Sequence, residues 1–221
     1  MSLGKPLSAA QESFFKVALG VFAVFYGLRL TWLSLNGSIL QMLKLLLIAV
    51  LALMVGKLTG QLLGLQKLSN QLGRAARERF SASAAGPQRA GDGFKTCAGL
   101  FCAAPLGILG SIQDGLSAYY YPLGVKAVMD GLAAMGFVEF FGWGVILAAL
   151  PVLALQGSIT LLCMQYLKPV LETHGLVDAT NATGGLVVFA VALVILELKR
   201  IALADYLPSL VFAPVIAWVL H

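Results

Sequence analysis

The stretch from Gly99 to Leu116, GLFCAAPLGILGSIQDGL, determines how the rest of the chain is interpreted. Its apolar run contains Pro105 near the centre and passes directly into Ser111, Gln113 and Asp114. Inside a membrane, a helix broken by proline is tolerated where its freed backbone groups face protein or a water-filled cavity. Discontinuous helices of this kind are also found at transport sites. We therefore expect a broken membrane helix with a polar end.

A second segment, LPVLALQGSITLL, begins at Leu150 and repeats the same order of residues. Pro151 precedes Gly157-Ser158-Ile159, just as Pro105 precedes Gly110-Ser111-Ile112. Proline lacks the N–H that an interior helical residue donates and obstructs the helix around it. The repeat predicts two proline-broken helices that carry a duplicated Gly-Ser-Ile element.

The composition is that of a membrane protein. Of the 221 residues, 59% are hydrophobic and 11% are charged, and the mean hydropathy is +0.89. Soluble domains have about a quarter of their residues charged. We expect one integral membrane domain over residues 1–221, built as an all-α bundle. The net charge of +5 is concentrated in one stretch, so it indicates orientation in the membrane and not a nucleic-acid partner.

The apolar segments predict about seven spans, since a spanning helix needs about 20 residues. The third is short and would measure about 24 Å as a helix, against about 30 Å for the hydrocarbon core. The predicted spans are Phe14–Leu35, Ile39–Leu65, Cys97–Ile112, Leu123–Phe141, Phe140–Leu167, Gly184–Leu198 and Ile201–Leu220.

Loop charge predicts the orientation. The stretch from Lys67 to Lys95 has an excess of Lys and Arg, which is typical of a cytoplasmic loop. Lys199-Arg200 gives a second basic turn, whereas Lys168 to Thr183 is weakly acidic and is expected outside. This places the N-terminus in the cytoplasm and the C-terminus outside. Small polar residues from Ser81 to Gly93 predict a mobile segment within the basic loop.

Lys126 and Asp130 are charged residues within a predicted span. Four residues apart on a helix, they lie on one face and can form an ion pair. Ionisable residues inside a membrane are candidates for function. The alternative is a structural ion pair near the outer surface, because Lys126 lies only one turn after Pro122.

Gly56, Gly60 and Gly64 recur every four residues and so share one face of the second predicted span. Small residues at this spacing allow two helix backbones to approach closely. This face can pack within the subunit or against a second copy in a homo-oligomer.

No enzymatic or metal-binding motif is present. The chain has neither H-E-x-x-H nor G-x-S-x-G, and its only histidines are His174 and His221. The spacing of Cys97 and Cys102 lacks the further ligands of a zinc site, and Cys163 is isolated. We expect no catalysis, no metal and no cofactor.

Three blocks resemble a known family: LFCAAPLGILGSIQDGL, then KAVMDG, then LPVLALQGSITLL. They are similar to the YqgA-like bacterial membrane proteins grouped as the domain of unknown function 554 family. Ala104 stands where that family often has glycine. The resemblance implies a multi-pass protein of the bacterial cytoplasmic membrane, and it implies no activity.

The sequence favours a secondary transporter or channel for a small solute or ion in the lipid bilayer. The alternative is a structural or regulatory membrane protein that assembles through its helix faces. We expect two broken helices to face each other around one polar cavity, with charged residues near it. The candidate substrate-binding or pore residues are Ser111, Gln113, Asp114, Lys126, Asp130, Gln156 and Ser158.

Overall fold

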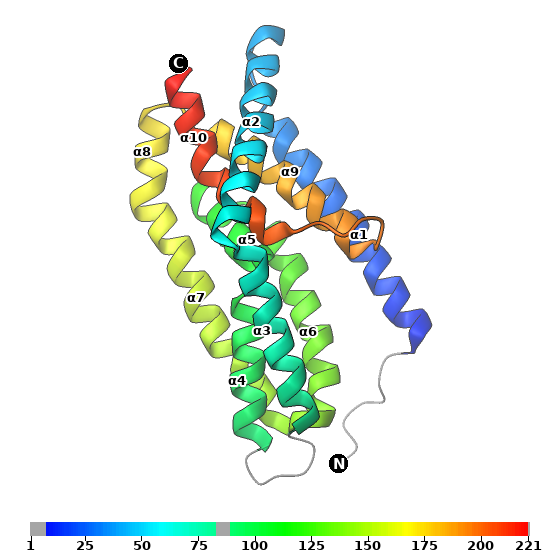
Figure 1. Cartoon of the computed structure of the whole chain (residues 1–221). Coiled ribbons are helices and arrows are strands. Elements are labelled where there is room, and N and C mark those ends of the chain that lie inside the picture. Colours follow the sequence, from blue (N-terminus) through cyan, green and yellow to red (C-terminus); the bar gives the residue numbers. More distant parts are fainter. Residues whose placement is uncertain (1–7, 83–88, 221) are drawn as a thin grey trace.

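The computed structural model describes residues 8–82 and 89–220, which form helices joined by short connections and contain no strand (Figure 1). The all-α class predicted from composition is confirmed. The helices are α1 (Ala9–Ser34), α2 (Ile39–Leu63), α3 (Leu65–Ala82), α4 (Arg89–Cys102), α5 (Pro105–Ser117), α6 (Tyr121–Phe141), α7 (Ala149–Leu162), α8 (Lys168–Thr173), α9 (Val177–Ile195) and α10 (Ser209–Val219), with the shorter 3₁₀ or π segments η1 (Gly142–Ala148), η2 (Cys163–Leu167) and η3 (Leu203–Tyr206).

Within the described ranges, four helical runs are long and apolar enough to cross a membrane, and a bent pair makes a fifth candidate. The first two runs have clear start signals, because Ser8 and Ser38 each form a capping box with the glutamine three residues later. The bent pair consists of α4 and α5. The other two candidates are the long run Tyr121–Thr173 and α9.

The α4–α5 pair bends by 58° between Cys102 and Pro105. Ala104 is extended, as the residue before a proline prefers, and Pro105 is the first residue of α5. Helix α5 then occupies the centre of the molecule (Figure 1), where Leu109 and Leu116 are only 1% exposed. The predicted broken segment therefore forms the core of the bundle.

The run Tyr121–Thr173 reverses direction at η1, where Gly142 adopts a φ of +71°. Helix α6 is antiparallel to α4, since Gly93 lies against Phe141 while Phe101 lies beside Lys126. Helix α7 then runs parallel to α5. Pro151 lies in the first turn of α7, a position that proline tolerates without interrupting a helix.

Glycines bring two helix pairs into close contact. Gly27 of α1 leaves no room for a side chain, because an added Cβ would lie 2.7 Å from the backbone nitrogen of Phe189 in α9. Gly56 faces the backbone of Ser209, and Gly60 faces the backbone of Asp205. Gly64 has a different role: it adopts φ +67° and ends α2.

Two stretches expected as loops are helical. The basic stretch Lys67–Lys95 forms α3 and the start of α4, with its central residues 83–88 outside the described ranges. Helix α3 is amphipathic, and Leu65, Leu68 and Leu72 recur along it at helical spacing. The stretch Lys168–Thr183 forms α8 and the first half of α9. Polar composition indicated a loop in both places. In α9, however, the short polar side chains are buried on a helix face that packs against other helices.

Candidate functional site

The side chain of Lys126 lies at the break between α4 and α5 and is 3% exposed. Its Nζ atom donates a hydrogen bond of 2.8 Å to the carbonyl oxygen of Phe101 and also pairs with Asp130. In an unbroken helix, the Phe101 carbonyl would accept from the N–H of residue 105, and Pro105 has none. Lys126 therefore satisfies the carbonyl that the proline leaves free. A cation is also favoured there by the negative end of the α4 dipole.

Gln156 of α7 approaches the same place. An added Cβ on Gly107 would lie 2.7 Å from Gln156 Nε2 and 3.0 Å from Lys126 Cε, so both side chains converge on this glycine. The Gln156 Nε2 atom is buried and has no hydrogen-bond partner among the described residues. A buried amide donor without a partner is costly, so this position is a candidate ligand contact.

Ser111 continues the face of α5 that contacts α7. Its hydroxyl donates to the Gly107 carbonyl at 2.8 Å, while its own carbonyl accepts from Thr160 Oγ1 at 3.2 Å. One turn further, an added Cβ on Gly115 would lie 2.6 Å from Cys163 Cβ. Small residues on α5 thus allow α7 to pack closely along it.

The structure does not bring all the predicted site residues to one place. It groups Lys126, Asp130 and Gln156 at the break and places Ser111 one turn away. Ser158 is exposed on α7, and its hydroxyl donates back to the Ala154 carbonyl at 2.6 Å. The two Gly-Ser-Ile elements therefore lie on neighbouring parallel helices, but their serines differ in environment.

Gln113 lies on another face of α5, toward α9. It is 0% exposed, and an added Cβ on Gly184 would overlap its amide nitrogen. One turn further, Asn181 Nδ2 donates to Ser117 Oγ at 2.6 Å. Asp114, in the same turn as Gln113, is half-buried. The predicted residue Gln113 thus belongs to a second polar region between α5 and α9, and Asp114 follows it in the same turn of α5.

The polar residues of α9 were not among the predicted candidates. Thr180, Asn181 and Thr183 are 1%, 6% and 0% exposed, although the sequence places them in a stretch that we expected to be a loop. The signal that could have found them is the run of small residues at Gly184-Gly185, which allows α1 and α5 to approach this part of α9.

With the geometry established, comparison with known proteins identifies the family. A family model described as "Protein of unknown function (DUF554)" matches residues 1–218. The chain belongs to the DUF554 family. It is similar to the "Uncharacterized membrane protein YdfK" of Bacillus subtilis (strain 168), with 30% identity over 204 residues, or 92% of this chain and 82% of the relative. It is also similar to the "Uncharacterized protein YqgA" of Escherichia coli (strain K12), with 30% identity over 166 residues, or 74% of this chain and 70% of the relative. No solved structure matches the chain.

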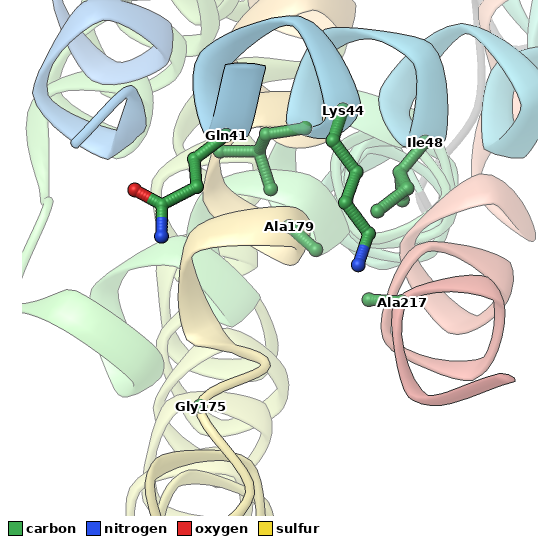
Figure 2. A pocket seen from close by; sticks show the side chains of 7 residues that line it. Gln41, Lys44, Ile48, Gly175, Ala179 and Ala217 are labelled. Carbon is green, nitrogen blue, oxygen red and sulfur yellow. The ribbon is translucent and has the colours of Figure 1, made fainter. Parts of the chain in front are cut away.

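This DUF554 protein also has a hollow of about 190 Å³ between α2, α9 and α10, away from the predicted residues. Figure 2 shows the Lys44 ammonium beside Ala217 at this hollow, with Gln41 near its edge. Its volume is below the roughly 300 to 1,000 Å³ of typical small-molecule pockets. We therefore assign the candidate site to the helix break, where charged and amide groups converge.

Proposed function

We propose that this membrane protein moves a small solute or ion across the bacterial cytoplasmic membrane, as a secondary transporter or a channel. The observation that supports this most is the Lys126–Asp130 pair at the α4–α5 break, in which Lys126 is buried and Asp130 is partly buried. Charged groups are costly in a membrane interior and often mark transport pathways. Broken helices supply free backbone groups at such sites.

The unpartnered amide of Gln156 favours a ligand site over a purely structural ion pair. A structural cap requires only Lys126, Asp130 and the Phe101 carbonyl, which already satisfy one another. Gln156 Nε2 is a further donor close to the same place, and it has no hydrogen-bond partner within the described part of the chain. A solute that accepts a hydrogen bond from Gln156 Nε2 would supply the missing partner.

The alternative role, assembly through the glycine face of α2, has less support. Gly56 and Gly60 are in contact with the backbones of Ser209 and Asp205 in the same chain. That face is therefore occupied within the subunit and is not free for a partner.

We place seven segments across the membrane: α1, α2, α4 with α5, α6, α7, α9 and α10. Two contacts support a common side for the basic stretches. Lys16 pairs with Glu197 at 3.0 Å, which places the start of α1 beside the end of α9. The Gln66 backbone nitrogen donates to Asp205 Oδ1 at 2.9 Å, which places the start of α3 beside η3. Both contacts are compatible with a cytoplasmic N-terminus.

Flux into proteoliposomes tests the proposal. A panel of labelled sodium, potassium, chloride, phosphate and neutral amino acids is compared for wild type, Lys126→Met and Ser158→Ala. We expect at least one solute to show protein-dependent flux that Lys126→Met lowers at least tenfold and Ser158→Ala retains. Equal flux in wild type and Lys126→Met would contradict the assignment of the site.

A further inference from the structure

The buried polar groups between α5 and α9 form a second region, separate from the Lys126 site. We define the amide cluster as Gln113 and Ser117 of α5 with Asn181 of α9. Both amide atoms of Gln113 and the Oδ1 atom of Asn181 are buried and have no hydrogen-bond partner among the described residues. Unsatisfied buried polar atoms are rare and costly, so three of them along one helix interface require a partner.

We propose that the amide cluster binds a monovalent cation, sodium or potassium. The unpartnered oxygens of Gln113 and Asn181 are hard ligands of the kind that such cations prefer, and Ser117 Oγ lies 2.6 Å from Asn181 Nδ2 beside them. No carboxylate belongs to the cluster itself. Magnesium and calcium usually require carboxylate ligands, so amide and hydroxyl oxygens alone suit a single positive charge.

The local charge also favours a cation over an anion. Gln113 and Ser117 belong to the last turn and a half of α5, where the helix dipole is negative. The half-buried Asp114 lies in the same turn, and that last turn contains no basic residue. The opposing positive end of α9 has Asp178 in its first turn. The negative end of α5 and the carboxylates of Asp114 and Asp178 favour a positive charge next to the cluster, and Asp178 offsets the positive end of the α9 dipole.

Glycine at position 184 allows this arrangement. An added Cβ there would overlap the Gln113 amide, so a larger residue would displace the amide from the helix interface. The hydroxyls of Thr180 and Thr183 already have partners within α9, because they donate to the carbonyls of Leu176 and Ala179 at 3.3 and 2.8 Å.

This inference deepens the proposed function, because the bound cation would serve as its coupling ion. Binding is therefore measured at equilibrium in detergent, without transport. A cation response without any solute flux would contradict the transport proposal and leave the cation site supported. Flux that is present without any cation response would contradict only the cation site.

The test compares thermal unfolding of the purified protein in sodium, potassium and choline chloride at equal ionic strength. A ligand that binds only the folded state raises the unfolding temperature, by about 2 to 4 °C at several times its dissociation constant. We expect a saturable rise in sodium or potassium relative to choline. Gln113→Met should abolish it, and the exposed Gln61→Met, which makes the same chemical change in α2, should retain it.

Asn181→Ser is the second test variant if Gln113→Met does not fold, because it removes one amide oxygen and keeps a small polar side chain. Loss of the cation response in this variant supports the site. An identical unfolding temperature of wild type in all three salts would overturn the proposal and indicate that the amides bind only water. A response that Gln113→Met or Asn181→Ser retains in full would overturn it as well.

Discussion

The Nζ atom of Lys126 lies 2.8 Å from the carbonyl oxygen of Phe101, the acceptor that Pro105 leaves without a backbone donor. One side chain thus stabilises a helix break and forms an ion pair with Asp130. This relationship connects a proline in one helix with a charged residue in the next.

Removing both partners of the ion pair should destabilise the protein by less than the sum of the two single removals. Asp130→Asn leaves the Lys126 charge buried with only a carbonyl acceptor, and Lys126→Met leaves the carboxylate of Asp130 without its partner. Each single substitution should lower the free energy of unfolding by about 2 kcal/mol or more, whereas the double variant should lower it by less than the sum of the two. Thermal unfolding of the four proteins measures this, and strictly additive losses would contradict coupling between the two groups.

Gly107→Ala should lower transport while the fold is retained. The added methyl group would meet Gln156 Nε2 and Lys126 Cε, which are the far ends of flexible side chains that can move aside. The move would displace both from the site. Gly157→Ala is the matched control, because an added Cβ there meets nothing within 4 Å. Equal flux in the two variants would argue against a role for this convergence.

Gly60→Ala should destabilise the protein through the α2 contact with η3. The added Cβ would overlap the backbone of Asp205, which cannot move without shifting η3, and overpacking of this kind costs about 1 to 3 kcal/mol. Gly73→Ala in α3 meets nothing within 4 Å and should stabilise its helix by up to about 1 kcal/mol. Unfolding temperatures and gel-filtration profiles in detergent compare the two. An unchanged temperature for Gly60→Ala would contradict the close packing.

Labelling of introduced cysteines tests the orientation. In a chain whose three native cysteines are replaced by serine, Thr173→Cys should react with an impermeant reagent in intact cells. Lys199→Cys should react only after the cells are permeabilised. Both original side chains are exposed. The opposite pattern would reverse the topology.

The long apolar helices could be predicted from the sequence because their length and hydropathy are properties of single segments. The pairing of Lys126 with Asp130 followed from their spacing, since residues four apart share a helix face. The bend at Pro105 followed from the missing backbone donor. Each of these features depends only on local chemistry.

The remaining features depend on how the helices are rotated and packed. The repeated Gly-Ser-Ile gave no indication that Ser111 would be buried and Ser158 exposed. The polar half of α9 resembled a loop because Thr and Asn suit both loops and buried helix faces. The direction of Gln113, toward α9 and not α7, is decided by contacts with Gly184 that no single segment contains.

The most direct test of transport at the Lys126 site is solute flux through the Lys126→Met/Asp130→Asn double variant. This variant removes the ion pair without leaving an unpaired charge, so we expect it to fold. Gel filtration and thermal unfolding are the checks of its fold. We predict protein-dependent flux in wild type and a loss of at least tenfold in the folded double variant. Full flux in that variant would show that the pair only stabilises the helix break, and would contradict the assignment of the transport site.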